Sequence, residues 1–272
     1  MSVINTNVSA LRAQNALTVN ARAQSTAMEQ LSTGSRINAA KDDAAGLAIG
    51  QSMTSQVRGL NQAVRNLNDG INMMQTAEGA LNETSNMLQR MRELAVQSAN
   101  GSYSSDQRTY LQTEFVALSS QIGKIATDTK WNDQSLLAAA STAFTFQAGK
   151  DSGQTVGVTI NAMTLTGLNI TAAITVSTTT TASASLATLD SAIGLVNTQR
   201  ATIGAGINQM TYAADNLSNV AANAAASRSS IMDTDYATAS TQLSKTQIIQ
   251  QAATAMLAQA NQQPVSVLTL LK

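Results

Sequence analysis

The sequence predicts a mainly α-helical protein, in which long helices pack as antiparallel coiled coils and a small β-hairpin region interrupts them. Three observations support this fold class. Apolar residues recur at alternating steps of three and four over long stretches. Aromatic residues make up only 3% of the 272 residues, and Pro264 is the only proline, so little in the chain breaks a helix. The middle of the chain is instead rich in β-branched residues.

Both ends of the chain carry apolar stripes at helical spacing. These stripes favour paired terminal helices, and their outer faces would leave apolar surface exposed unless other copies of the chain or another protein covered it. We therefore expect the terminal stripes to be contact surfaces. Their members are Ile4, Val8, Leu11, Leu31, Met256, Leu257, Val265, Leu268, Leu270 and Leu271.

The longest uninterrupted pattern predicts a helix from residue 44 to residue 99. Asn100 and Gly101 predict its end, because both residue types tolerate the left-handed backbone that closes helices. Ordinary core helices also carry apolar stripes, but a repeat of 3.5 residues held over this length favours a left-handed coiled coil. The stripe, called the seam below, reads Met53, Val57, Leu60, Val64, Leu67, Ile71 and Met74.

Two further helices are expected, over residues 104–129 and 186–226. The first begins at Ser104, which can form a capping box with Gln107. The second has a seam of its own that Arg200 interrupts. Between the two helices, "TAFTFQAGKDSGQTVGVTI" alternates apolar and polar residues about a glycine-containing turn, which predicts a β-hairpin region at about residues 140–180. The Ser/Thr run at 177–185 is expected to be a solvated surface loop.

The composition excludes several kinds of chemistry. The chain has no histidine and no cysteine, so thiol nucleophiles, imidazole bases and thiolate or imidazole metal sites are excluded. Its formal net charge is zero, which gives no electrostatic basis for binding nucleic acid. No segment has the pattern of a signal peptide or a membrane span. We expect no enzyme activity, cofactor, metal, nucleic-acid binding or membrane insertion.

The stretch "STGSRINAAKDDAAGLAIG", residues 32–50, raises the question of a ligand site. It lacks the Gly-Lys-Ser/Thr of a phosphate-binding loop, and Gly204–Gly206 lacks the third glycine of a dinucleotide motif. Asp42 and Asp43 are a candidate cation site, but an aspartate just before an Ala-rich helix is far more often its N-cap. The stretch is therefore not interpreted as a ligand site.

Several strings resemble the terminal regions of bacterial flagellins: "LRAQNAL", "LSTGSRINAAKDDAAGLAI", "LQRMRELAVQSANGSYSSDQR" and "ANQQPVSVLTLLK". The resemblance covers about residues 1–140 and 186–272. It implies a secreted structural subunit that self-assembles into the helical, tubular filament of the flagellum for motility, in a short form with two inner domains only. Residues 1–43 and 230–272 would form a terminal core domain of the inner tube, and 44–229 a rod domain. The joint, at about 32–46, would contain Gly34, Arg36, Lys41, Asp42, Asp43 and Gly46.

The resemblance also implies partners. These are further copies of the chain, hook-associated junction and cap proteins, a flagellar export chaperone, the type III export apparatus and, for the monomer, the host Toll-like receptor 5. The segment "LQRMRELAVQSAN" matches the part of flagellins that this receptor binds and that also packs between subunits. The implied contacts are Gln89, Arg90, Glu93, Leu94, Gln97 and Glu114, with Arg90, Leu94 and Glu114 at the centre.

Three alternatives share some of these features. A cytoplasmic signalling coiled coil has similar heptads, but it should lack the hairpin-like centre and the apolar C-terminal end. An enzyme displayed on a flagellin scaffold needs a catalytic insert, and the short, histidine-free centre offers none. A hook-associated junction protein is the nearest alternative among structural proteins.

Overall fold

The computed structural model describes residues 6–138, 141–170 and 174–269, with side chains as far as Gln262. The chain divides into two compact units. The first comprises Met1–Val57 and Ala222–Lys272, and the second comprises Arg58–Ala221. Helices predominate in both, as the low aromatic and proline content predicts.

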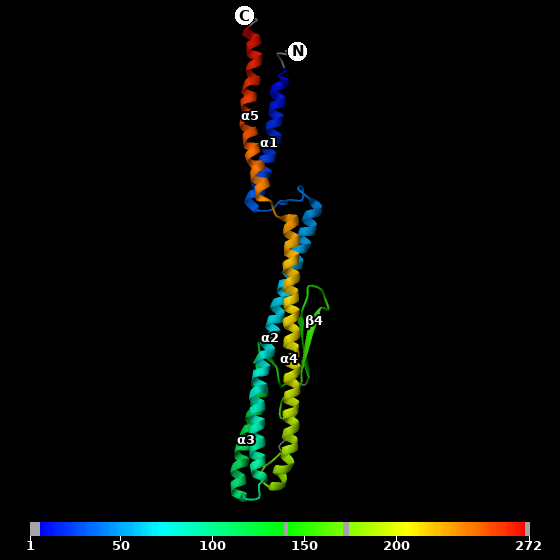
Figure 1. Cartoon of the computed structure of the whole chain (residues 1–272), viewed down its shortest axis with the longest axis vertical. Helices are drawn as coiled ribbons and strands as arrows, with labels where there is room; N and C mark the ends of the chain where they lie inside the picture. The colour runs from blue at the N-terminus through cyan, green and yellow to red at the C-terminus, as the bar shows by residue number, and fades with distance from the viewer. Residues whose placement is uncertain (1–5, 139–140, 171–173, 270–272) are drawn as a thin grey trace. The chain divides into compact units, whose positions relative to one another are not determined.

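In the first unit, α1 (Val8–Thr33) and α5 (Tyr236–Thr269) lie side by side and antiparallel (Figure 1). Asn7 begins α1: its side-chain oxygen accepts a hydrogen bond from Ala10 N at 3.1 Å, and its Nδ2 donates to Ala260 O at 2.8 Å. Helix α1 ends at Gly34, whose φ of 71° is the left-handed conformation that glycine adopts without strain. The predicted pairing of the terminal helices is confirmed.

The second unit is held together by the predicted seams. It contains α3 (Ser105–Asp128) and the adjoining parts of α2 (Ala44–Ala99) and α4 (Thr179–Met232), and α3 runs alongside α2 (Figure 1). Seam side chains of all three helices form one core, and this confirms the antiparallel coiled-coil packing. The fully buried members include Leu67, Met74, Leu81, Leu88, Ile122, Leu189, Val196, Ile203 and Met210.

The C-terminus of α2 and the N-terminus of α3 lie where the sequence predicts, but α2 is not closed by the residues expected to close it. The capping box of Ser104 and Gln107 is present. Helix α2 ends at Ala99 as predicted, but neither Asn100 nor Gly101 adopts the left-handed conformation. Instead the Arg108 guanidinium donates to Ser98 O and Asn100 O, each at 2.9 Å. A side chain from α3 therefore satisfies the terminal carbonyls of α2.

Two small antiparallel sheets follow α3. β1 (Lys130–Trp131) pairs with β2 (Gln134–Ser135) through a tight turn in which Asn132 and Asp133 have positive φ. β3 (Thr142–Gln147) pairs with β4 (Thr155–Ile160), in the register Thr142↔Ile160 to Gln147↔Thr155. Both sheets are local hairpins. The β3–β4 hairpin is the one that the alternating pattern predicts, whereas β1–β2 lies before the predicted region.

Strand β4 packs against α4 on one face. Its alternate residues Val156, Val158 and Ile160 are buried. Gly206 of α4 lies against Val158, where a Cβ would collide with the valine side chain. The absence of a side chain at Gly206 therefore lets the strand approach the helix closely.

A buried amide of α4 also holds the end of β4. Gln199 is 2% exposed, and its Nε2 donates to Thr159 O at 3.0 Å while its Oε1 accepts from Asn161 N at 3.1 Å. Both ends of the amide are therefore used by the backbone of one strand.

Three predicted boundaries are wrong. The β-hairpin region does not extend to residue 180, because β4 ends at Ile160 and the described residues up to 178 contain turns but no strand. Helix α4 begins at Thr179 rather than 186 and continues to Met232 rather than 226.

The Ser/Thr run from Thr179 onward is therefore helix and not a solvated loop. The Thr178 hydroxyl accepts from Thr181 N at 3.2 Å, as an N-cap does, and Ala182 and Ser185 are buried. Threonines that suit a strand by propensity here begin a helix. Within the described residues, no helix is long and apolar enough to cross a membrane.

Candidate assembly and receptor-binding surfaces

Helices α1 and α5 carry large apolar side chains that the first unit leaves exposed. They are between 41% (Ile249) and 68% (Met256) exposed. Single exposed apolar residues are common on proteins, but several of them along two paired helices make these helices a candidate contact surface. The set is Val8, Leu11, Val19, Met28, Ile248, Ile249 and Met256.

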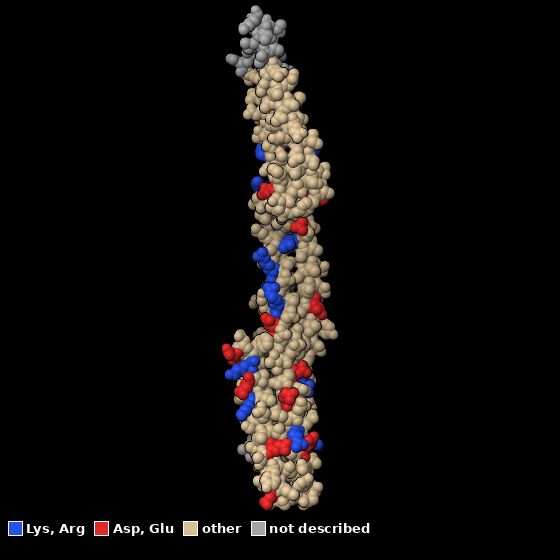
Figure 2. All heavy atoms as spheres, turned by 90° about the vertical axis from the view of Figure 1, so that its left-hand side faces the viewer, with Lys and Arg blue, Asp and Glu red and all other residues tan. Residues whose placement is uncertain are grey.

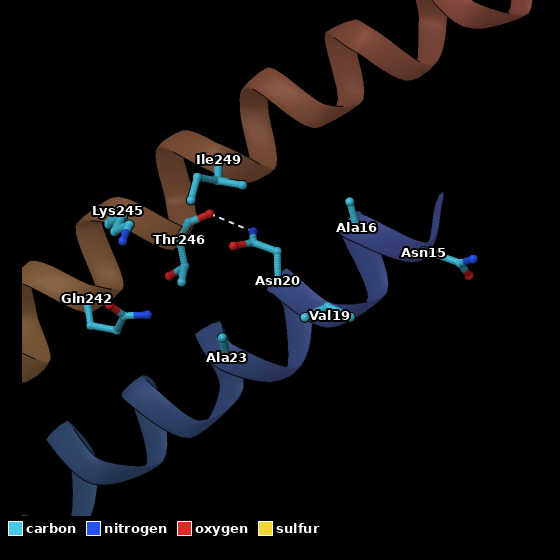
Figure 3. Close-up of a pocket in the computed structure, with 9 residues that line it drawn as sticks. All are labelled: Asn15, Ala16, Val19, Asn20, Ala23, Gln242, Lys245, Thr246 and Ile249. Atoms are coloured by element: carbon cyan, nitrogen blue, oxygen red, sulfur yellow. Dashed lines mark hydrogen bonds between the residues drawn. The ribbon is translucent and has the colours of Figure 1, made fainter. Parts of the chain in front are cut away.

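A groove of ≈470 Å³ lies between α1 and α5 at this surface. Figure 3 shows Asn20 on α1 directed toward α5, where its Nδ2 donates to Thr246 O at 2.8 Å. Asn20 is only 8% exposed, so it adds a buried polar bridge to this helix pair, beside the one that Asn7 makes to Ala260. The lining residues are Asn15, Ala16, Val19, Asn20, Ala23, Gln242, Lys245, Thr246 and Ile249.

The predicted terminal stripes fall into three groups. Val8, Leu11 and Met256 are exposed, whereas Leu31 and Leu257 are partly buried. Val265 and Leu268 belong to the backbone of α5, with no side chain described. Ile4, Leu270 and Leu271 lie outside the described residues.

The predicted joint contains a short crossing of two chain segments. Ser35 and Asp233 form an isolated antiparallel bridge, and Thr234 N donates to Gly34 O at 2.9 Å. Arg36 completes the crossing: its backbone N donates to Met232 O at 2.7 Å and its Nη2 to Ile231 O at 2.6 Å. A guanidinium placed on the last carbonyls of a helix stabilises the negative end of its dipole.

The two aspartates of the joint hold backbone amides. Asp43 Oδ1 accepts from Gly46 N at 2.9 Å, which is the N-cap geometry expected for α2. Asp42 Oδ2 accepts from Asn38 N at 3.2 Å and from Ala39 N at 3.0 Å. A Cβ on the buried Gly46 would collide with Asp43 and Ile37, and Lys41 is exposed. In the part of the chain that the structure describes, acidic residues form no group suited to a metal ion.

In the second unit, Arg90 links α2 to α3. Its Nε donates to Glu114 Oε1 at 2.9 Å, and its Nη1 donates to Glu93 Oε2 at 3.0 Å. The hydrogen bond to Glu114, followed by that to Glu93, raises the pKa of the guanidinium above its usual value. Arg90 and Glu114 are about half exposed and Glu93 is 67% exposed, so the three side chains form a paired charged group at the surface. Figure 2 shows acidic and basic side chains close to one another in the lower part of the view, below a run of basic side chains.

The other residues of this predicted site differ in accessibility. Gln89 is exposed, and Gln97 is partly buried because its Nε2 donates to the Tyr103 hydroxyl at 3.0 Å. Leu94 is fully buried in the core of the unit. The expectation that Leu94 is a direct contact for a partner is therefore not supported, since its seam position gives it a packing role.

Three features of this surface were not predicted from the sequence. Tyr110 and Val116 of α3 are exposed, at 74% and 53%. Arg92 Nε donates to Asp190 Oδ1 at 2.6 Å and so connects α2 to α4, which raises the pKa of Arg92. Tyr110 and Val116 both lie off the apolar seam of α3, which contains Leu111, Phe115 and Ile122, and this position signalled their exposure. The Arg92 pairing depends on tertiary structure.

The helical regions of the chain match two models of a known protein family. The model of the bacterial flagellin N-terminal helical region matches residues 4–142, and that of the C-terminal helical region matches residues 186–271. The chain belongs to the bacterial flagellin family. This flagellin is therefore a structural subunit of the flagellar filament and not an enzyme. Flagellins polymerise with themselves, and the filament that its relatives form is extracellular.

Curated relatives match nearly the whole chain. The flagellin of Halalkalibacterium halodurans is 41% identical over 271 residues, covering 99% of this chain and 100% of the relative. Flagellin B of Vibrio cholerae is 36% identical, covering 98% and 99%. A flagellar filament 30.7 kDa core protein of Treponema maltophilum is 38% identical, covering 99% of each.

Solved structures support the same fold. The crystal structure of Bacillus cereus flagellin is 28% identical, has a TM-score of 0.50, and covers 56% of this flagellin and 88% of that chain. A structure described as a flagellar hook-associated protein from Vibrio parahaemolyticus has a TM-score of 0.59, covering 71% of this chain and all of that chain. Its identity is only 16%, so it shows a shared fold and nothing more.

Proposed function

We propose that this flagellin polymerises through the outer faces of α1 and α5. In this proposal residues 1–43 and 230–272 form the core domain that lines the inner tube, residues 44–229 form the rod, and residues 32–46 are the joint. The observation that carries the proposal is the row of exposed apolar side chains on the terminal helices. Burial of apolar surface contributes roughly 25 cal/mol per Å², and for this row it requires a neighbouring copy.

Substitution of the exposed apolar residues tests this proposal. Leu11→Asp or Met256→Asp should prevent polymerisation seeded with sheared filaments, followed by light scattering and electron microscopy. Circular dichroism should show helical monomers, because both residues are exposed before assembly. Ser25→Asp, at an exposed polar position of α1, is the matched control and should polymerise. Normal filaments from the Leu11 and Met256 variants would refute the assignment.

We infer a second role for the monomer, as a ligand of the host Toll-like receptor 5. The proposed contacts are the accessible polar groups of α2 and α3, namely Gln89, Arg90, Glu93, Gln97 and Glu114, with Leu94 acting from the core beneath them. The paired Arg90 group supports the proposal, because an ordered guanidinium loses little entropy when it binds. In the filament this surface packs between subunits and is hidden from the receptor.

A reporter-cell titration tests the receptor role. Arg90→Ala monomer should be roughly ten- to a hundredfold less potent than wild type, as expected for loss of a central arginine at an interface. Arg92→Ala is the matched control, because Arg92 is similarly exposed and paired but lies outside the proposed contacts. Cross-linked filament should be weakly active. Equal potency of monomer, cross-linked filament and the Arg90 variant would exclude both the site and its masking.

The remaining proposed partners act in the export of the chain or bind at the ends of the filament. They are the flagellar export chaperone, the type III export apparatus, and the hook-associated junction and cap proteins. A chain that reaches the cell exterior by this route needs no cleaved signal.

A further inference from the structure

A polar cleft in the second unit contains the side chain of Arg200, whose guanidinium N–H groups make few hydrogen bonds. Arg200 interrupts the seam of α4 between Val196 and Ile203, both of which are fully buried. Its side chain is 33% exposed and extends to Glu78 of α2. A charged group in a seam is unfavourable unless a partner compensates for its lost hydration.

The contact with Glu78 is a long, partly exposed ion pair, which provides only part of that compensation. Nη2 of Arg200 lies 3.8 Å from Glu78 Oε1, which is too long for a hydrogen bond. The Nε of Arg200 is buried, and no hydrogen-bond partner for it exists among the described residues. Nε and Nη2 form the edge of a guanidinium that donates two parallel hydrogen bonds to a carboxylate. Within the described structure this edge makes neither bond.

The surroundings of Arg200 suit a small polar group. The cleft has a volume of ≈380 Å³ and is lined by Gln75, Glu78, Gly79 and Asn82 on one face of α2. A Cβ on Gly79 would contact nothing within 4 Å, so the glycine leaves the cleft open. Two side-chain amides flank the guanidinium and can donate further hydrogen bonds to an acceptor.

We propose that this Arg200 cleft binds an exposed carboxylate side chain of a second copy of the chain in the filament. The carboxylate follows from a guanidinium that is one-third exposed in the cleft and whose Nη2 makes only a 3.8 Å contact. A bond to the buried Nε as well requires the Arg200 side chain to turn toward the cleft. The second copy follows from self-polymerisation, which surrounds each subunit with others, and from a chain whose 16 acidic residues balance its 16 basic ones. The cleft contributes a directional, charge-assisted contact in addition to apolar burial.

The test compares monomer stability with polymerisation in the full chain. Arg200→Gln should raise the critical concentration for seeded polymerisation about tenfold or more at low salt, the size expected when one partner of a buried pair is lost. Its critical concentration should depend less on salt than that of wild type. The melting temperature of the monomer should be unchanged or higher, because an uncompensated cation has been removed.

Glu78→Gln is the matched control. It removes the acidic side chain of the cleft and should leave the critical concentration unchanged or lower it. Arg200→Lys keeps the positive charge but lacks the planar guanidinium that can donate two parallel hydrogen bonds. Its critical concentration should lie between those of wild type and Arg200→Gln. The proposal is overturned if Arg200→Gln and Glu78→Gln lower the monomer melting temperature equally with normal polymerisation, since Glu78 is then the partner. An Arg200→Gln variant with neither property changed would indicate a cleft filled only by water, and would also overturn it.

Discussion

Asn20 on α1 and Thr246 on α5 are joined by a hydrogen bond of 2.8 Å, from Asn20 Nδ2 to the Thr246 carbonyl oxygen, at a position that is almost fully buried. A buried asparagine between paired helices fixes their register at some expense of stability. The alignment of α1 with α5 therefore depends on a polar contact as well as on apolar packing.

Replacement of this asparagine should separate register from stability. Asn20→Leu is expected to raise the melting temperature of the monomer by a few degrees, roughly 1 kcal/mol, because an apolar side chain fills the interface. The register of α1 against α5 should become less uniform in this variant. The chain has no cysteine, so cysteines placed at Ala16 and Ile249, which both line the groove, report the alignment by disulfide yield. An unchanged yield in Asn20→Leu would show that Asn20 does not set the register.

Charges placed in the seam should unfold the second unit. Leu67→Asp and Ile203→Asp each place a carboxylate at a position with no solvent exposure, and should lower the free energy of unfolding by several kcal/mol, about 3 or more. Urea titration followed by circular dichroism measures the loss. Tyr212→Asp, at a residue of α4 that is 75% exposed, is the control and should change stability by less than about 0.5 kcal/mol.

The β3–β4 turn should accept inserted residues. Gly153 in this turn has a φ of 86° with open space around it, and Asp151 is exposed. A Gly-Ser segment inserted after Asp151 should lower stability by only about 0.6 kcal/mol per doubling of loop length. The same segment inserted after Ala182 interrupts α4 at a fully buried residue and should destabilise the monomer strongly. Equal melting temperatures for the two insertions would contradict this assignment of turn and helix.

The start of α5 should be sensitive to acid. Asp235 Oδ2 accepts from the Thr238 hydroxyl at 2.7 Å and Oδ1 accepts from Ala237 N at 2.9 Å, and these bonds lower the pKa of Asp235 below its usual value. The folded state therefore favours the ionised form. The stabilisation is complete above the unfolded pKa, about 4, and is lost as the pH falls through the lower folded pKa.

Comparison of Asp235→Ala with wild type measures this effect. The difference in melting temperature should be constant between about pH 5 and 7 and should shrink below about pH 4. Asp235→Asn keeps a capping oxygen without a titrating charge, so its melting temperature should be less affected and should lack this acid transition. A wild-type advantage over Asp235→Ala that persists at low pH would rule out titration of Asp235 as the cause.

Much of the fold could be predicted because long helices are specified locally. The seam from Met53 to Met74 and the cap at Asp43 define α2, and both signals lie within the sequence of the helix itself. The start of α4 was missed because the Thr-rich stretch has β propensity, whereas Thr178 caps a helix. The packing of Ala182 and Ser185 against the unit outweighs that propensity.

The candidate sites could be predicted only in part. The pairing of Arg90 with Glu93 is readable from their spacing on one helix, but that with Glu114 depends on the approach of α3. Leu94 shows the limit of resemblance, since a residue that matches a binding segment is here a core residue. The open edge of Arg200 was visible in sequence only as an interruption of a repeat; its lack of a partner required the structure.

The two hydrogen bonds that Gln199 makes to β4 have a consequence for the solubility of a protein that works at very high local concentration. The outer edge of a two-stranded sheet offers free N–H and C=O groups to any extended chain that approaches. At Thr159 and Asn161 these groups are already taken by a buried amide of the same chain. Gln199 thus acts as a substitute for a neighbouring strand, and this end of β4 is closed to strand exchange between crowded subunits.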